Sequence, residues 1–218
     1  GDPLLHPHVV DIVRRLSAVA AVSVETDLLT TDLAFVSALA ASGADVVAVH
    51  LPAMTPVVYR DVMGVDGMTR VVENIQRLLE ARQRLASGTP LVVPLFTKLL
   101  ANFDEMEHWY DTWLRAIGSA VIVGPTAFGG RISGIDVADM TPPVRRPCAR
   151  LSSRITILSD GRIVACEQDA FGEHALGRLG DDRIADVWQG PQQDLRAAHG
   201  RLAQLPDLCN RCKEWHRP

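Results

Sequence analysis

The first half of the chain alternates between two hydrophobic patterns. Apolar residues recur at helical spacing in four segments, residues 7–19, 31–43, 67–86 and 103–117. Between them lie short apolar runs with the length of buried strands, at residues 21–24, 45–50, 91–96 and 120–123. Parallel strands need a crossover of about a dozen residues, which is usually a helix. The alternation therefore predicts an α/β fold with a parallel sheet built from βα units.

Residues at the expected helix ends support this division. Thr31 and Thr55 are good N-caps, because a threonine hydroxyl accepts a hydrogen bond from a free N–H group of the first helical turn. Pro56 suits the first helical position, where its missing N–H group costs nothing. Gly43 is placed to end the helix that begins at Thr31. Four strands and their connecting helices are thus predicted within residues 1–123.

From residue 124 the pattern changes. Glycines and prolines without a clear period fill residues 124–146, which we interpret as a linker. Beyond it, β-branched runs at residues 154–158 and 162–166 flank Asp160-Gly161. Asp-Gly between two such runs is a strong signal for a β-hairpin with a two-residue turn.

The pattern in the rest of the chain predicts short helices and turns. Two short helices and a closing turn are expected at residues 181–188, 191–202 and 206–212. The predicted organisation is therefore a domain over residues 1–123, the linker over residues 124–146, and a second domain over residues 147–218 made of a β-hairpin and helices.

The composition is that of an ordinary folded protein. Of the 218 residues, 47% are hydrophobic and 22% are charged, and the formal net charge is −4. The slightly acidic balance argues against a nucleic-acid partner, because such proteins neutralise phosphates with a basic surface. The sequence contains no run of about 18 apolar residues that would predict a membrane span. Its first residues lack the pattern of a signal peptide. We therefore expect a cytoplasmic protein with no membrane partner.

The four cysteines are the strongest candidates for chemistry. Cys148, Cys166, Cys209 and Cys212 all lie in the last third of the chain, spaced as Cys-x17-Cys-x42-Cys-x2-Cys. In a reducing compartment, this grouping indicates metal ligands rather than disulfides. A two-residue hairpin turn would place Cys166 opposite Ile155, so that a bend after Cys148 brings both thiols to one end of the hairpin. Four thiolates suit a structural zinc ion or an iron–sulfur cluster, and the spacing leaves both open.

Few other side chains suggest chemistry. Glu167, Gln168 and Asp169 follow Cys166, and they either approach the metal or a substrate or form a solvated end of the hairpin. His50 ends a predicted strand, at the edge where parallel sheets bind ligands, although a hydrogen-bonded polar residue is the simpler interpretation. No pattern of a Ser/His/Asp triad or a P-loop is present. We assign no catalytic residue.

The cysteines stand in a longer stretch with a family resemblance. The SPASM domain that follows many radical S-adenosylmethionine (SAM) enzymes resembles this chain at residues 147–148, 155–169, 176–180, 184–188, 195–196, 199 and 209–215. The hairpin, glycine turn, tryptophan helix and terminal cysteine pair come in the family order. The resemblance implies that the four cysteines ligate an auxiliary 4Fe–4S cluster, which favours iron–sulfur over zinc. Full SPASM domains carry about seven cysteines for two clusters, so four cysteines imply the shortened single-cluster form known as twitch.

The first 123 residues resemble the later part of the partial (β/α) barrel of radical SAM enzymes. Residues 1–7 resemble the motif Gly-Gly-Glu-Pro-Leu-Leu-His-Pro, whose backbone meets the amino group of SAM. The resemblance thus implies cofactor-binding residues at Gly1, Asp2 and Pro3. Two segments depart from the family pattern, residues 24–29 in place of Thr-Asn-Gly and residues 49–51 in place of Ser-Leu-Asp. The fold implied is α/β, an incomplete parallel (β/α) barrel followed by the small iron–sulfur domain.

One family motif is absent. No cysteine precedes Cys148, so the Cys-x3-Cys-x2-Cys loop, which binds the cluster that cleaves SAM, would lie upstream of Gly1. We expect the C-terminal part of a longer radical SAM enzyme that acts on a peptide or small molecule, with an auxiliary cluster for electron transfer or stability. Whether the chain itself is an enzyme stays open. The alternatives are a non-catalytic zinc module and a degenerate scaffold or binding protein.

Overall fold

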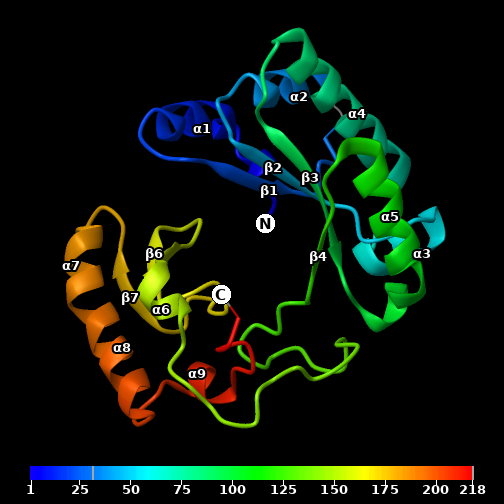
Figure 1. Ribbon diagram of the computed structural model, residues 1–218. Helices are drawn as coiled ribbons and strands as arrows, with labels where there is room; N and C mark the ends of the chain where they lie inside the picture. Colours follow the sequence, from blue (N-terminus) through cyan, green and yellow to red (C-terminus); the bar gives the residue numbers. More distant parts are fainter. Residues whose placement is uncertain (31, 218) are drawn as a thin grey trace. The chain divides into compact units, whose positions relative to one another are not determined.

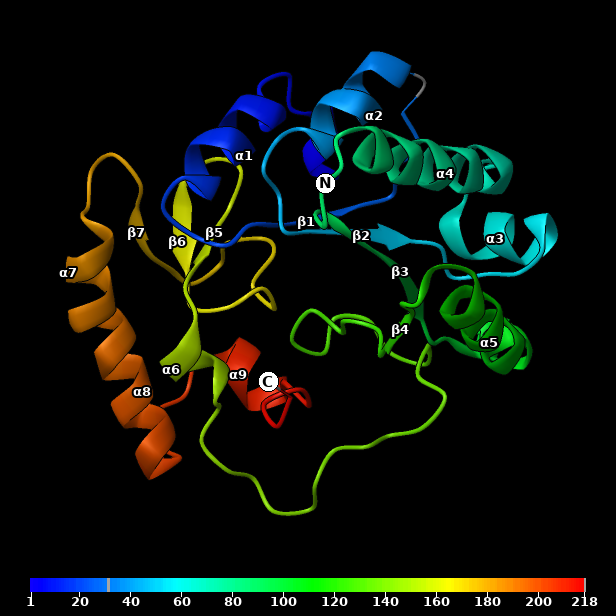
Figure 2. The same cartoon turned by 45° about the horizontal axis from the view of Figure 1, so that its top comes forward.

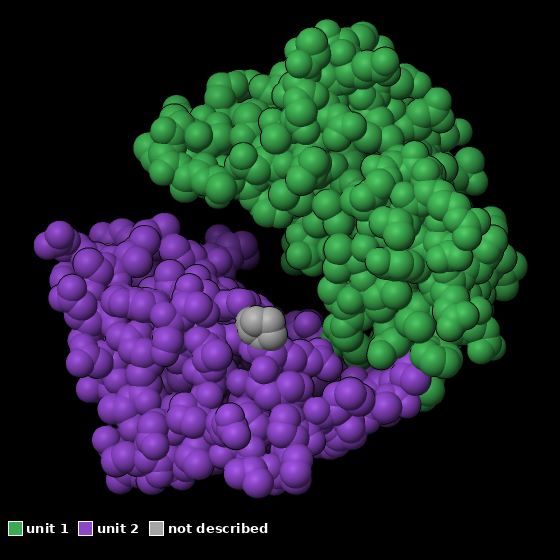
Figure 3. Space-filling view, in the orientation of Figure 1, with its two compact units in different colours: residues 1–125 green, residues 126–218 purple. Residues whose placement is uncertain are grey.

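The computed structural model describes residues 1–30 and 32–217, so the expected helix cap Thr31 lies outside the described residues (Figure 1). The chain divides into two compact units, residues 1–125 and residues 126–218, which are coloured green and purple in Figure 3. Each unit contains a sheet of its own. None of the helices within the described residues is long and apolar enough to cross a bilayer.

The first unit contains the predicted parallel sheet. Its strands are β1 (Ser23–Thr26), β2 (Val46–His50), β3 (Leu91–Thr97) and β4 (Val121–Val123), which lie in the order β1-β2-β3-β4. All three neighbouring pairs are parallel, so the α/β prediction is confirmed. The carboxyl ends of β1 and β2 therefore meet at the same edge of the sheet, after Thr26 and His50.

Helices connect these strands. They are the 3₁₀-helix η1 (Pro3–Leu5), α1 (Val9–Ser17), α2 (Leu33–Ala40), α3 (Pro56–Met63), α4 (Met68–Arg84), the 3₁₀-helix η2 (Leu100–Glu105) and α5 (Met106–Ile117). The Thr55 hydroxyl accepts a hydrogen bond from the Val58 N–H at 3.4 Å, which confirms the predicted cap of α3. At the start of α2, the carboxylate of Asp32 accepts hydrogen bonds from the N–H groups of Ala34 and Phe35.

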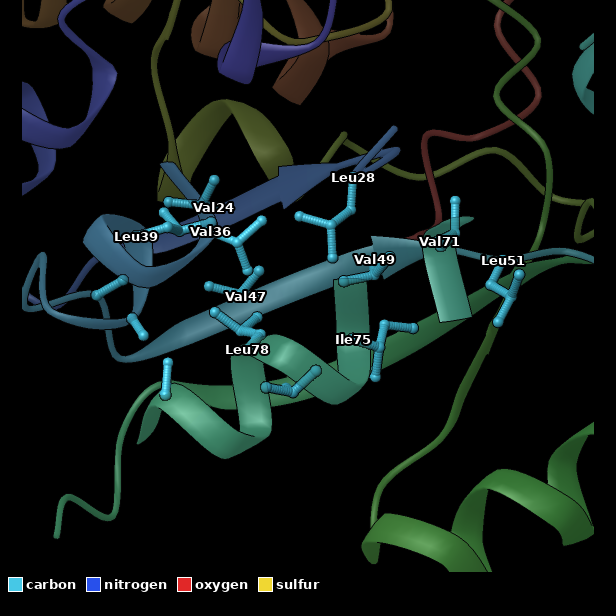
Figure 4. Close-up of a cluster of buried hydrophobic side chains, with 14 of the residues drawn as sticks. Val24, Leu28, Val36, Leu39, Val47, Val49, Leu51, Val71, Ile75 and Leu78 are labelled. Atoms are coloured by element: carbon cyan, nitrogen blue, oxygen red, sulfur yellow. The ribbon is translucent and has the colours of Figure 1, made fainter. Parts of the chain in front are cut away.

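The core of this unit lies between the sheet and helices α2 and α4, which run along one face of it (Figures 1 and 2). Figure 4 shows the side chains that fill this layer: Val24, Leu28, Val36, Leu39, Val47, Val49, Leu51, Val71, Ile75 and Leu78. Full burial of one such side chain stabilises a fold by about 1.5–3 kcal/mol. Along β1, Val24 is buried in this layer, whereas Ser23 and Glu25 alternate with it and are exposed.

The second unit is built around a small antiparallel sheet. Its elements are α6 (Arg150–Ser153), β5 (Thr156–Ile157), β6 (Arg162–Val164), β7 (Ala175–Arg178), α7 (Ile184–Gln189), α8 (Pro191–Arg201) and α9 (Asp207–Arg211). The strands lie in the order β5-β6-β7. The hairpin and the helices α7 and α8 were predicted, whereas α6 and β7 were not, and the predicted closing turn is the short helix α9. Residues 124–146 contain no helix or strand.

The hairpin turn differs from the prediction. Ile157 pairs with Ile163, and the Leu158 N–H donates to the Arg162 carbonyl at 2.9 Å, so three residues rather than two form the loop. Of these, Gly161 adopts a left-handed conformation with φ +85°, which fits the common three-residue hairpin with glycine in its last loop position. The expected pairing of Cys166 with Ile155 is therefore wrong, because the register is displaced by one residue.

Candidate metal centre

The four predicted ligands line one pocket of the second unit. Cys148 precedes α6, Cys166 follows β6, Cys209 lies within α9, and Cys212 directly follows α9. All four are free thiols; Cys166 and Cys209 are buried, and the other two are half-buried. Three segments that are far apart in the sequence thus bring four thiols to one place.

Packing of hydrophobic residues next to the cysteines holds these segments. Ile163 and Val164 on β6 are fully buried and fix the strand that leads to Cys166. Leu208, beside Cys209, packs against Gly129, where a Cβ atom would lie 2.6 Å from the leucine Cγ. Gly129 also has a φ of +65°, so glycine is needed there for both conformation and space. The linker region therefore contributes to the support of α9.

The thiols in this pocket resist ionisation. Burial raises the pKa of Cys166 to about 11 and the pKa of Cys209 to about 12, and the other thiols add to both shifts. The pKa of Cys212 is raised for the same reasons, first burial and then nearby negative charge. Four thiolates this close repel one another unless a cation lies between them. The pocket thus has the donor chemistry of a metal centre.

Backbone N–H groups are already directed at two of the sulfur atoms. The Glu214 N–H donates to the Sγ of Cys212 at 3.3 Å. A backbone hydrogen bond from Gln168 opposes the rise in the pKa of Cys166. In both cases the donor is two residues after the cysteine. Such bonds favour the thiolate form that binds a metal.

Two arginines line the same pocket. Arg150 is only 6% exposed, and its Nη1 lies 3.0 Å from a carboxylate oxygen of Glu167. Arg145 donates from Nη2 to the Cys209 carbonyl at 2.6 Å. Among the described residues, the Nε atoms of both arginines have no hydrogen-bond partner, and the Nη1 atom of Arg150 has only its ion pair with Glu167. Buried donors of this kind call for acceptors, and the sulfur atoms of an anionic cluster would supply them.

His199 adds another unpartnered group to this pocket. It lies in the last turn of α8, and neither ring nitrogen has a hydrogen-bond partner among the described residues. Burial, assisted by the nearby charge of Arg145, lowers the pKa of His199 to about 4, so the ring is neutral at pH 7. Four thiols together with these unpartnered buried donors therefore fit an iron–sulfur cluster.

A buried polar network closes one side of the pocket. The Gln168 Nε2 atom donates to a carboxylate oxygen of Glu214 at 3.0 Å, and the Gly129 N–H donates to the Gln168 Oε1 atom at 3.0 Å. Asp169 is 3% exposed and accepts hydrogen bonds from the backbone of Glu173 and His174. Of the two alternatives for this segment, a solvated hairpin end is therefore wrong for Gln168 and Asp169, which are buried.

The sequence analysis did not identify Arg145, Arg150 and Glu214 as site residues, and it gave His199 no role. Arg150 and Glu214 each lie two positions after a cysteine, which was the available signal. The described residues contain no group of three His, Cys, Asp or Glu side chains arranged to hold a single metal ion.

The predicted cofactor-binding residues lie in the first unit. Gly1, Asp2 and Pro3 line an open pocket with the residues that end β1 and β2. The Asp2 carboxylate accepts hydrogen bonds from the Thr26 hydroxyl at 2.7 Å and from the Asp27 N–H at 2.8 Å. The side chain of Asp2 therefore fixes the first residues to the carboxyl edge of the sheet.

This second pocket is acidic. His50 Nε2 and a Glu25 carboxylate oxygen lie 2.8 Å apart, and this hydrogen bond raises the pKa of His50 and lowers that of Glu25. Burial raises the pKa of Asp27, and Asp2 and Glu25 add to the shift. The two sequence departures from the radical SAM pattern, at Glu25 and His50, therefore contact each other. Carboxylates around the pocket suit a ligand with a positive charge.

Comparisons with known proteins agree with this geometry. Residues 148–213 match the SPASM family, an iron-sulfur cluster-binding domain. An uncharacterized protein of Treponema pallidum (strain Nichols) is 28% identical over 99% of the chain, which spans 62% of that protein's length. The structure of BtrN in complex with AdoMet and 2-DOIA has a TM-score of 0.53 at 16% identity, covering 94% of this chain and 78% of BtrN. A second BtrN structure, in an open conformation, has a TM-score of 0.47 at 16% identity, covering 95% and 79%.

The second unit thus carries a SPASM domain, a class of iron–sulfur cluster-binding domain, and the matched residues include all four cysteines. The chain as a whole has a fold similar to that of BtrN. The match over residues 148–213 agrees with the resemblance to SPASM domains in the sequence.

Proposed function

We propose that Cys148, Cys166, Cys209 and Cys212 bind one 4Fe–4S cluster, and that the chain is part of a radical SAM enzyme in which this cluster is auxiliary. The observation that carries the proposal is the pocket that the four thiols share with the unpartnered buried donors of Arg145 and Arg150. The match of residues 148–213 to an iron–sulfur family supports iron and sulfide over zinc.

The residues of the pocket have separate tasks. The four thiolates hold the group, and the N–H groups of Gln168 and Glu214 stabilise the thiolate form of the cysteines. Arg145 and Arg150 offset the negative charge that four thiolates bring into a buried site. When bound, the cluster supplies a centre for one-electron transfer. Because four cysteines occupy all four iron atoms, a role in electron transfer or stability is favoured over direct binding of substrate.

The acidic pocket at the carboxyl edge of the first sheet is the proposed SAM site. Gly1, Asp2 and Pro3 line it, and SAM carries positive charges on its amino and sulfonium groups that suit the carboxylates of Glu25 and Asp27. The BtrN structure contains AdoMet, which is consistent with such a site in this fold. A peptide or small-molecule substrate and a cytoplasmic location remain parts of the proposal.

The test is anaerobic reconstitution of the full chain with iron and sulfide, followed by metal and sulfide analysis. We expect about four iron and four sulfide per chain, with the visible absorbance of a 4Fe–4S cluster. Cys166→Ser should lose most of this absorbance, whereas Ser152→Ala, an exposed position on α6, should retain it. A colourless protein with one zinc ion and no sulfide would overturn the proposal.

A further inference from the structure

His199 is the most completely buried of the unpartnered groups in the cysteine pocket. Its residue is 2% exposed, and its side chain lines the pocket together with all four thiols. Neither ring nitrogen has a hydrogen-bond partner among the described residues. An imidazole carries at least one N–H group in every protonation state. A buried donor without an acceptor costs about 1–3 kcal/mol, so the position calls for an acceptor in the pocket.

Each side-chain oxygen that lines the pocket with His199 already accepts a hydrogen bond from another group. Gln168 Oε1 accepts from the Gly129 N–H, and the two carboxylate oxygens of Glu214 accept from the Ala127 N–H and from Gln168. The other pocket side chains are arginines, which only donate, apolar groups and the four thiols. The sulfur atoms of the four cysteines are the other acceptors that line the pocket with the ring.

Helix α8 holds the ring in place. Gln192, Arg196 and His199 share one face, because they are spaced by four and three residues. The Gln192 Nε2 atom donates to the Leu151 and Ala165 carbonyls at 3.3 and 3.4 Å. Arg196 donates to the Leu151 carbonyl at 3.2 Å. These bonds join α8 to the backbone next to Cys166 and to α6, so the ring is fixed relative to the thiols.

We propose that an imidazole N–H of His199 donates a hydrogen bond to a sulfur atom of the cluster that the four cysteines hold, and that this bond raises the reduction potential of the cluster. The inference rests on the proposed iron–sulfur function. Reduction adds negative charge to the sulfur atoms, so a fixed N–H donor stabilises the reduced form more than the oxidised form. His199 thus adjusts the reduction potential of the cluster through a hydrogen bond and does not bind iron.

The first test compares reduction potentials in the reconstituted full chain. His199→Phe removes the donor but keeps a ring. It should lower the equilibrium constant for reduction of the cluster about tenfold, which shifts the reduction potential by about 59 mV to more negative values for one electron. His199→Asn retains an N–H donor and should recover part of the shift. His174→Phe, at an exposed position, is the matched control and should leave the potential unchanged. Unchanged potentials in all three variants would overturn the inference.

The second test needs no substitution. Pulsed electron paramagnetic resonance of the reduced chain, labelled with imidazole-¹⁵N histidine, should show a weak coupling between the cluster and one ring nitrogen. No ¹⁵N coupling would overturn the inference even if His199→Phe failed to assemble a cluster. A strong coupling, typical of a nitrogen bound to iron, would also overturn it and make His199 a ligand. A wild-type chain without iron and sulfide would instead refute the proposed function.

Discussion

At the residue scale, Arg150 is the charge on which the cysteine pocket most depends. It forms ion pairs with Glu167 at 3.0 Å and with the buried carboxylate of Glu214 at 3.7 Å. Without Arg150, Glu167 retains its ion pair with Arg154 and Glu214 retains its ion pair with Arg217, so the cost should fall below the roughly 3–5 kcal/mol of a buried charge left unpaired. The Nε atom of Arg150 also has no hydrogen-bond partner among the described residues, so loss of this side chain should weaken both the fold and the retention of the cluster.

We therefore predict that Arg150→Gln lowers the temperature at which the reconstituted chain loses its cluster absorbance by about 10 °C or more. The neighbouring Arg146 is exposed, so Arg146→Gln is the matched control and should change this temperature little. Equal midpoints for the two variants in a thermal scan would show that the buried ion pairs do not support the pocket.

The Glu25–His50 pair gives a prediction for pH. The pKa of His50 is raised above its ordinary value of 6.5, mainly by the hydrogen bond with Glu25, whose pKa is lowered below 4.5. The stabilisation from His50 is complete below pH 6.5 and is lost as the pH rises through the raised pKa. The contribution of Glu25 is complete above pH 4.5 and is lost as the pH falls through the lowered pKa.

We expect an NMR titration of the full chain to give His50 a pKa above 6.5, and Glu25→Gln to bring this pKa down. Glu73→Gln, on an exposed position of α4, should leave it unchanged. If His50 titrates at or below 6.5 in the unaltered chain, the ion pair does not form in solution, and the acidic pocket loses the contact between its two strands.

At the element scale, α8 positions the cysteine segments through a polar face. Gln192 is fully buried, and its amide bonds the carbonyls of Leu151 and Ala165. Gln192→Met retains the side-chain length but removes the donor to the Ala165 carbonyl and leaves the Leu151 carbonyl with Arg196 alone, which should cost about 1–3 kcal/mol. The next residue, Gln193, is exposed. Gln193→Met should therefore leave the thermal midpoint of cluster loss unchanged, and comparable losses in both variants would contradict this role of α8.

The elements also show which parts of the fold were predictable. Strands β2 and β3 are continuous apolar runs, and Thr55-Pro56 is a local cap signal, so their positions followed from neighbouring residues alone. The hairpin register did not, because it depends on whether the turn contains two or three residues, and Asp160-Gly161 occurs in both. Strand β7 was missed because Ala175–Arg178 contains a glycine and only two apolar residues, and its pairing with β6 comes from tertiary structure.

The candidate site also has a part that was predictable from the sequence and a part that was not. Residue type and spacing alone identify cysteines as candidate metal ligands, so the four candidate ligands were found in the sequence. Arg150 and His199 acquire their importance from burial, and burial of a charged or polar side chain depends on contacts between distant segments. Glu25 and His50 lie in separate departures from a family pattern, and His50 was also noted at the end of a predicted strand, but the sequence did not predict their contact. The strand pairing of β1 with β2 is what brings them together.

At the scale of the whole molecule, the chain contains two compact units with separate sheets, residues 1–125 and residues 126–218. All four candidate cluster ligands belong to the second unit, and the large hydrophobic core lies in the first. A structural metal centre contributes its binding energy to the folding of the unit that contains its ligands. Removal of the cluster should therefore destabilise one unit more than the other.

We predict that hydrogen exchange, measured by mass spectrometry on the full chain with and without its cluster, will resolve this difference. Peptides that contain β6 and α9 should exchange at least about tenfold faster after cluster removal, a loss of about 1.4 kcal/mol in local stability. Peptides from β2 and β3 should be unchanged, because their protection comes from the apolar layer beneath α2 and α4. Equal acceleration in both units would mean that the cluster stabilises the chain as one cooperative body, and the assignment of a local supporting role to the cysteine pocket would then fail.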